Sequence, residues 1–246
     1  SAASDVYKRQ VPEVNPQAIL KHKGIIANPN CSTIIMVMAL KPIYDLAKIK
    51  RVIVSTYQAV SGAGKEGIDE LDAQVRDHSE GREMTANILP SASAEKHYPI
   101  AFNLIPQIDV FCDNLYTKEE MKMVNETKKI MEDYEMRITA TTIRVPVYRS
   151  HSESVNIELE KEVDLGAMRE ALAKFPGVTV QDDPSKQEYP MPLYTSEKDD
   201  VYVGRLRRDE SCEKSYNMWV VGDQIRKGAA LNTLQIAETM IKNGWI

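Results

Sequence analysis

The chain alternates between segments with a helical spacing of apolar residues and shorter segments rich in β-branched residues. The first pattern predicts helices over residues 17–22, 31–48, 67–78, 117–131, 165–174 and 228–243. The second predicts strands over residues 24–27, 51–59, 105–110, 137–147, 154–159, 178–180, 201–206 and 215–221. Because strands and helices do not alternate strictly in the middle of the chain, the pattern predicts an α+β fold with a mixed sheet.

Composition narrows the class of protein. The 246 residues are 43% hydrophobic and 27% charged, as in an ordinary globular protein, and no apolar run reaches the roughly 20 residues needed to span a bilayer. A net charge of −5 argues against nucleic acid or an anionic membrane as the main partner. Three cysteines, odd in number and far apart, exclude a disulfide framework and favour a reducing compartment such as the cytoplasm.

The first ten residues differ from the rest. Residues 1–10 show no clear helical or strand period and lack the charged-then-apolar order of a signal peptide. We interpret them as a non-native scar, and a frayed native terminus is the alternative. On the first interpretation residue 11 lies in mid-protein, and the chain is a truncated gene product.

Cys31 is the first candidate for chemistry, because it follows Asn-Pro-Asn at the predicted start of a helix. Unpaired N–H groups and the positive end of the helix dipole favour a thiolate there, so the position predicts a lowered pKa and a nucleophile. A buried cysteine with a packing role is the alternative. Cys112 and Cys212 have no comparable setting and are expected to be structural.

Arg144 and His151 stand in one run after a predicted apolar strand. An arginine inside an apolar strand requires an anionic partner, which is either a protein carboxylate or a substrate carboxylate. A lone histidine such as His151 is most often a surface residue or a core residue with satisfied hydrogen bonds. The four histidines are scattered and no Cys/His cluster has ligand spacing, so no metal site is predicted.

Residues 62–67 match the pattern G-x-G-x-x-G after a strand and before a helix. A dinucleotide-binding unit needs a second parallel strand with an acidic residue after that helix, but residues 79–98 are polar. We therefore reject the fingerprint and keep a glycine-rich turn that lets the backbone approach a ligand.

Four motifs together resemble one family. They are NPNCST at residues 28–33, QAVSGAG at 58–64, RVPVYRSH at 144–151 and GAALN at 228–232, in the order found in bacterial-type aspartate-semialdehyde dehydrogenases. The resemblance covers residues 11–246. It implies NADPH-dependent reduction of L-aspartyl-4-phosphate to L-aspartate 4-semialdehyde and phosphate, on the route to lysine, diaminopimelate, methionine and threonine. It also implies a homodimer or homotetramer without nucleic-acid or membrane partners.

The resemblance implies roles for the matched residues. Cys31 would form the acyl-enzyme thioester, Gln58 would orient the substrate and His151 would be the acid/base. The implied substrate contacts are Asn30, Arg144 (on the α-carboxylate), Glu119 and Lys122; for the last two, a surface ion pair is the alternative. The implied NADP contacts are Ser61, Gly62, Gly64 and Gln224, of which Gln224 replaces the family's usual asparagine.

The family begins with a Rossmann domain whose glycine-rich phosphate loop is absent from this sequence. The family plan assigns residues 11–30 and 229–246 to a remnant of that NADP-binding domain and residues 31–228 to a catalytic and dimerisation domain. Apolar residues of the remnant are then expected to be exposed: Ile19, Ile25, Ile26, Leu234 and Ile241. The alternatives are an N-acetyl-glutamyl-phosphate reductase-like enzyme, a cysteine hydrolase and a non-catalytic dimerisation fragment.

Overall fold

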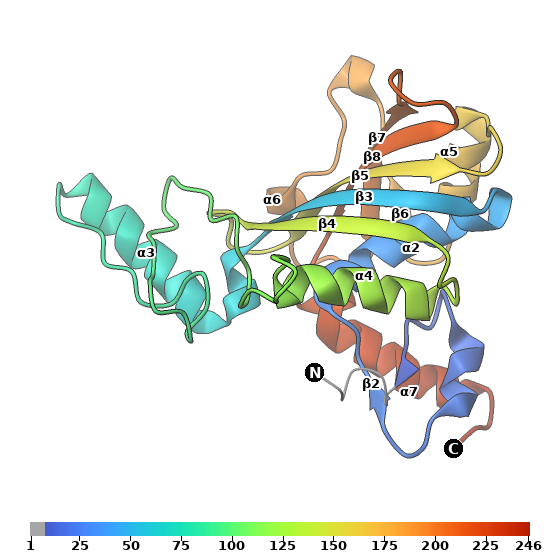
Figure 1. Cartoon of the computed structure of the whole chain (residues 1–246), viewed down its shortest axis with the longest axis horizontal. Coiled ribbons are helices and arrows are strands. Elements are labelled where there is room, and N and C mark those ends of the chain that lie inside the picture. Colours follow the sequence, from blue (N-terminus) through green and yellow to red (C-terminus); the bar gives the residue numbers. More distant parts are fainter. Residues whose placement is uncertain (1–7) are drawn as a thin grey trace.

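A mixed sheet forms the centre of the protein. The computed structural model describes residues 8–246, and within them six strands pair in the order β4-β3-β5-β8-β7-β6 (Figure 1). These strands are β3 (Ile49–Gln58), β4 (Arg137–Arg144), β5 (His151–Leu159), β6 (Val178–Val180), β7 (Val201–Arg208) and β8 (Ser215–Gly222). β3 pairs with β4, and β6 with β7, in parallel, whereas the other neighbours are antiparallel. The predicted α+β class with a mixed sheet is confirmed.

Three helices cover one face of this sheet: α2 (Cys31–Leu46), α4 (Lys118–Ile130) and α5 (Leu165–Lys174). α2 is apolar on nearly all sides because it lies between the sheet, α4 and α5. On the other face most side chains are exposed or half-buried, although Ser152 and Val221 are buried. Tyr57 and Trp219 contact each other there, with ring centroids 5.6 Å apart. The sheet therefore has one covered face and one open face in the single chain.

An arm extends from one end of the sheet (Figure 1). It consists of the 3-10 helix η2 (Val60–Ala63), helix α3 (Lys65–Ser79) and irregular chain up to α4, and it has a small core of its own. The strand predicted over residues 105–110 is wrong. Ile105 makes one bridge to Arg144, but Pro106 has no N–H to continue the pairing, and Asp109 adopts a left-handed conformation that turns the chain away.

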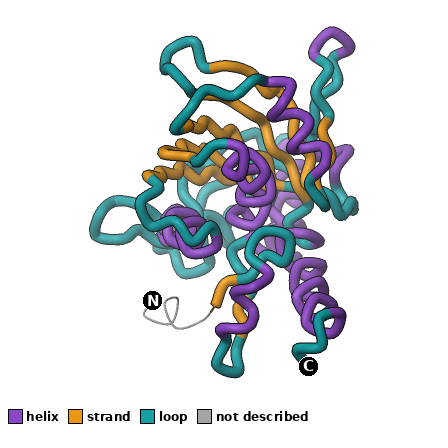
Figure 2. Tube along the Cα trace, turned by 90° about the vertical axis from the view of Figure 1, so that its right-hand side faces the viewer, coloured by secondary structure: helices purple, strands orange, loops and turns teal. Residues whose placement is uncertain are grey.

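The chain ends form a separate small cluster below the sheet (Figures 1 and 2). β1 (Lys8–Arg9) pairs in parallel with β2 (Ile26–Ala27), beside the 3-10 helix η1 (Pro16–Lys21) and helix α7 (Leu231–Lys242). α7 follows a π-helical turn, η4 (Arg226–Ala230). Residues 8–10, which the sequence assigned to the scar, belong to this cluster, and Gln10 is fully buried. Residues 1–7 lie outside the described part.

The expected exposure of this cluster is confirmed in part. Ile25, Leu234 and Ile241 are each more than half exposed. Ile26 is half-buried, and the prediction is wrong for Ile19, which packs with Ile236 of α7 in a common apolar cluster.

Most element boundaries agree with the sequence pattern. α4 begins after a capping box in which Thr117 and Glu120 each accept from the other's backbone N–H. Three short helices were not predicted: η2, η3 (Pro184–Lys186) and α6 (Pro192–Thr195). β5 begins at His151 rather than at residue 154, which places the histidine inside the sheet. In the described residues, no helix has both the length and the apolar character that crossing a membrane requires.

Candidate active site

A cavity of about 390 Å³ opens where α2, β3, β4, α4 and the arm meet. The predicted site residues that line it are Asn30, Cys31, Gln58, Gly62, Glu119, Lys122 and Arg144. The fold thus collects residues that are more than 100 positions apart in the sequence. In residues 8–246 there is no group of three or more His, Cys, Asp or Glu side chains that could hold a metal ion.

Cys31 is the first residue of α2, directly after its N-cap. The Asn30 side chain accepts from the Thr33 N–H at 3.0 Å, and Cys31 Sγ lies 3.4 Å from His151 Nε2. Burial, with a further contribution from the Glu119 charge, raises the pKa of the thiol to about 12 against the opposing effects of Arg144 and Ser32. The predicted lowering of this pKa is therefore wrong, because desolvation and Glu119 outweigh the helix N-terminus.

A backbone amide determines the proton position on His151. The Ala59 N–H donates to His151 Nδ1 at 3.0 Å, and a backbone N–H can only donate, so Nδ1 carries no proton. Burial, followed by the Arg144 charge, lowers the pKa of the ring well below its ordinary value, so the ring is neutral. Its proton is then on Nε2, which faces Cys31 Sγ. In this form His151 donates a hydrogen bond toward the cysteine.

Arg144 is buried at the end of β4, yet no carboxylate within the described residues forms an ion pair with it. One amino group donates to the Ala59 carbonyl at 2.7 Å, and Nε has no hydrogen-bond partner in this part of the chain. Burial lowers the pKa of Arg144, and Glu119 opposes that shift. The remaining N–H groups can therefore bind an anionic ligand.

Gly62 leaves room for these two side chains. A Cβ atom at residue 62 would lie 2.6 Å from Arg144 Nη1 and 3.3 Å from His151 Cε1. A glycine is needed here for close approach to the site's own side chains, independently of any cofactor.

Helix α4 supplies the acidic and basic groups of the cavity. Glu119 is buried and accepts from Asn30 Nδ2 at 2.8 Å and from Gln58 Nε2 at 3.3 Å. Lys122 Nζ lies 3.4 Å from Glu119 and 3.3 Å from Asp109. Burial lowers the pKa of Lys122, but the two carboxylates outweigh it and the pKa is raised.

Asp109 is a site residue that the sequence did not indicate. It lines the cavity and contacts Lys122, and its backbone φ is 67°. The turn after Pro106 brings it there, and no local motif marks an aspartate in an irregular loop. The loop around Pro90 and Ser91 also lines the cavity and was likewise not predicted.

The residues predicted to contact NADP differ in their position relative to the cavity. The Gln224 amide donates to Ser61 Oγ and accepts from the Ser150 N–H at 2.9 Å, so both ends of this buried side chain are used. Gly62 lines the cavity directly, and Gly64 (φ 84°) turns the chain into α3. Ser61 and Gln224 are both buried and do not line this cavity.

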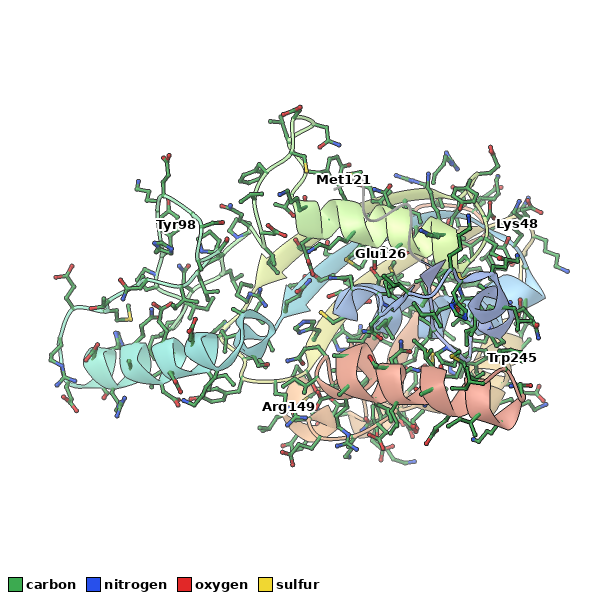
Figure 3. All side chains as sticks on the ribbon, turned by 90° about the horizontal axis from the view of Figure 1, so that it is seen from below. Lys48, Tyr98, Met121, Glu126, Arg149 and Trp245 are labelled. Atoms are coloured by element: carbon green, nitrogen blue, oxygen red, sulfur yellow. The ribbon has the colours of Figure 1, made fainter. Side chains whose placement is uncertain are left out.

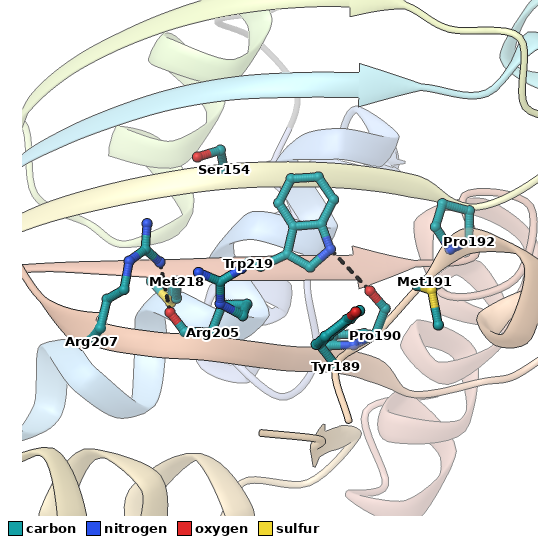
Figure 4. Close-up of a pocket in the computed structure, with 9 residues that line it drawn as sticks. All are labelled: Ser154, Tyr189, Pro190, Met191, Pro192, Arg205, Arg207, Met218 and Trp219. Atoms are coloured by element: carbon teal, nitrogen blue, oxygen red, sulfur yellow. Dashed lines mark hydrogen bonds between the residues drawn. The ribbon is translucent and has the colours of Figure 1, made fainter. Parts of the chain in front are cut away.

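A second cavity, of about 340 Å³, lies on the open face of the sheet (Figure 4). Trp219 Nε1 donates to the Pro190 carbonyl at 3.0 Å, and Arg207 donates to the Arg205 carbonyl at 2.8 Å. Met191 and Tyr189 complete much of the lining. None of the predicted site residues line it.

Comparisons with known proteins agree with this site. Residues 40–227 match the family described as semialdehyde dehydrogenase, dimerisation domain. The aspartate-semialdehyde dehydrogenase of Aquifex aeolicus is 55% identical over 238 residues, which is 96% of this chain and 68% of that protein. The enzyme of Bacillus subtilis is 52% identical over 94% of this chain and 67% of its own length. The chain thus spans about two thirds of the length of these relatives.

Solved structures share the fold. Aspartate semialdehyde dehydrogenase II of Vibrio cholerae, complexed with ASA, superposes with a TM-score of 0.90 at 45% identity, covering 97% of this chain and 69% of that one. The Candida albicans enzyme with NADP shares the fold at a TM-score of 0.70 and 24% identity, over 98% of this chain and 68% of that one. On its sequence and its fold alike, this chain belongs to the aspartate-semialdehyde dehydrogenase family.

Proposed function

We propose that this chain carries the thioester chemistry of the family's reaction, with Cys31 as the nucleophile toward L-aspartyl 4-phosphate. The observation that supports this most directly is the placement of Cys31 Sγ 3.4 Å from His151 Nε2, in a cavity that also contains a buried arginine with no ion-pair partner among residues 8–246. A nucleophile, a donor for an oxyanion and a carboxylate receptor are the parts that acyl transfer from this substrate requires.

The acylation step balances without a base from the protein. The Cys31 Sγ–carbon bond forms as the carbon–oxygen bond to phosphate breaks, and the thiol proton leaves with the phosphate. This route suits a thiol whose pKa is raised to about 12 and a histidine whose Nε2 already carries a proton.

In the second step NADPH, when bound, would supply a hydride to the thioester carbon. His151 would donate a hydrogen bond through its Nε2–H to the oxyanion that develops there. As the carbon–sulfur bond breaks and the aldehyde leaves, the Cys31 sulfur would take one proton through His151, and solvent would return that proton to Nε2. A preorganised donor in a desolvated site is the arrangement that stabilises such charge.

The substrate's charged groups have candidate partners. We assign the α-carboxylate to Arg144, whose planar guanidinium suits a two-point contact. The ammonium group is assigned to Glu119 beside Asn30, and the phosphate to Lys122. Gln58, hydrogen-bonded to Glu119, would orient the acyl group.

We assign the cofactor side of the cavity to the loop that contains Ser61, Gly62 and Gly64, with Gln224 behind it. Support comes from the close approach of Gly62 to the side chains of Arg144 and His151. NADP is the cofactor named for the Candida albicans relative.

The family match to a dimerisation domain supports assembly with further copies of the chain. We propose a homodimer that covers the open face of the sheet. Tyr57 and Trp219 lie on that face and are only half-buried within residues 8–246. The second cavity, which Trp219 lines, lies on the same face (Figure 4).

Phosphate-dependent reduction of NADP⁺ by L-aspartate 4-semialdehyde tests the proposal in the active holoenzyme. Cys31→Ser should abolish turnover, and mass spectrometry should find an acyl adduct on Cys31 in the unmodified protein after exposure to the acyl phosphate. Cys112→Ser is the matched control and should keep both properties. Hydrolysis of the acyl phosphate to the free acid, with no phosphate-dependent reduction of NADP⁺, would favour a cysteine hydrolase. Preference for N-acetyl-glutamyl phosphate would favour the related reductase.

A further inference from the structure

Glu126 lies on α4 outside the cavity but contacts the residue before the nucleophile. Its Oε2 atom accepts from the Asn30 backbone N–H at 2.6 Å, and the side chain is 5% exposed. Figure 3 shows Glu126 on the side of α4 nearer the N-terminal segment. Building on the proposed function, we propose that Glu126 is a positioning residue that holds Cys31 in register with the substrate-binding end of α4.

The same helix holds Asn30 at two points. Glu126 accepts from its backbone N–H, and Glu119 accepts from its side chain at 2.8 Å. The two carboxylates are seven residues apart, or about 10.5 Å along the helix axis. The side-chain oxygen of Asn30 meanwhile caps α2 by accepting from the Thr33 N–H. Backbone and side chain of this one residue therefore tie the start of α2 to α4.

α4 is in turn fixed to the sheet. Glu120 of its capping box accepts from the Thr142 N–H in β4 at 3.0 Å, two residues before Arg144. This hydrogen bond fixes the helix that carries Glu119 and Lys122 relative to the arginine. Through its hydrogen bond from the Asn30 N–H, Glu126 also fixes the peptide before Cys31 relative to this helix.

Removing the Glu126 contact removes one of the two hydrogen bonds between Asn30 and α4 and leaves the other groups of the cavity in place. A displacement of about 1 Å at a reacting atom costs on the order of 10²-fold in rate. Since Glu126 does not line the cavity, its loss should act on the rate of the chemical step more than on substrate affinity.

Two matched variants of Glu126 distinguish the effect of side-chain length from the effect of side-chain charge. Glu126→Asp keeps the charge but shortens the side chain by one methylene, so its oxygen no longer reaches the Asn30 N–H. Glu126→Gln loses the charge but keeps an oxygen acceptor at the same reach. Asn125→Ala, on the exposed side of α4, is the control.

In the active holoenzyme we expect Glu126→Asp to lower kcat by roughly 10–100-fold with KM for the semialdehyde within about threefold, as a misplaced nucleophile requires. Glu126→Gln should stay within about fivefold of the unmodified kcat. In a second readout, the rate of Cys31 alkylation by iodoacetamide should change in the aspartate variant and not in the glutamine variant, with Cys112 as internal reference.

Three results would overturn the proposal: an aspartate variant with normal kcat, a glutamine variant as slow as the aspartate one, or a glutamine variant that fails to fold. A purely structural role would change Tm and the labelling of Cys112 together with that of Cys31. Failure of the proposed function is separable, because Cys31→Ser would then retain turnover whatever Glu126 does.

Discussion

Gly62→Ala tests how closely the cofactor loop must approach the substrate-binding groups. The added Cβ would lie 2.6 Å from Arg144 Nη1, and ordinary van der Waals contact begins near 3.4 Å, so the guanidinium must retreat by about 0.8 Å (3.4 − 2.6). Misplacement on this scale costs on the order of 10²-fold. The corresponding loss of transition-state stabilisation is about 2.7 kcal/mol, at 1.36 kcal/mol for each factor of ten.

The expected result is a fall of roughly 10²-fold in kcat/KM for the semialdehyde, measured by phosphate-dependent NADP⁺ reduction in the active holoenzyme. Tm should change little, because Gly62 has no left-handed backbone that an alanine would strain. Gly64→Ala is the contrast: nothing lies near its added Cβ, but a φ of 84° makes alanine costly, so this variant should lose stability.

The reasoning would be refuted if Gly62→Ala left the semialdehyde kcat/KM unchanged. A rise in KM for NADP⁺ alone would show that residue 62 serves the cofactor and that Arg144 tolerates the methyl group.

Three further predictions concern the Cys31 thiol, the buried Glu153 and the activity of the chain by itself. Since the Cys31 thiol pKa is about 12, its alkylation rate should keep rising about tenfold per pH unit through pH 9, and a plateau near pH 7 would contradict this. Glu153 is fully buried with no partner for either oxygen among the described residues, and burial raises its pKa well above the ordinary value. The folded state then binds more protons than the unfolded state above about pH 4.5, so the free energy of unfolding falls by up to about 1.4 kcal/mol per pH unit because of this group. Glu153→Gln should remove this pH dependence in urea titrations at pH 5 and 8. An unchanged pH dependence would contradict the prediction. The 246-residue chain by itself should accept an acyl group on Cys31 but transfer no hydride. The glycine loop after β3 leads into α3, which lies in the arm, and the parallel strand β4 follows only after α4, so this segment does not form a compact dinucleotide-binding unit. Micromolar NADPH binding with turnover would contradict this prediction.

The local backbone structure could be predicted from the sequence alone. The helix over residues 165–174 has the bounds that its apolar spacing predicts. The capping box of Thr117 and Glu120 starts α4 where the pattern predicts a helix. Asn30 before Cys31 likewise predicts the start of α2. These features depend on hydrogen bonds and side-chain spacing within one turn, so a short window of sequence contains what determines them.

The gathering of the candidate site was predicted only through the motifs and their resemblance to a family. Composition and spacing do not bring Cys31, Arg144 and His151 together. The pairing of β3 with β4 and β5 brings Arg144 and His151 close, and the packing of α2 against the sheet adds Cys31. Asp109 and Glu126 were missed, since each acts through a contact with a residue distant in the sequence. The strand expected at residues 105–110 does not form, for a local reason, the proline. The apolar pattern of this segment hid that signal in the sequence.

The electrostatic state of the site was decided by the tertiary structure alone. The helix N-terminus at Cys31 is a local feature that favours a thiolate, but burial and the charge of Glu119 from another helix reverse its effect. The proton on His151 is placed by the amide of Ala59, 92 residues away. Desolvation and long-range hydrogen bonds depend on which segments meet in space, whereas backbone conformation depends mainly on neighbours in the chain.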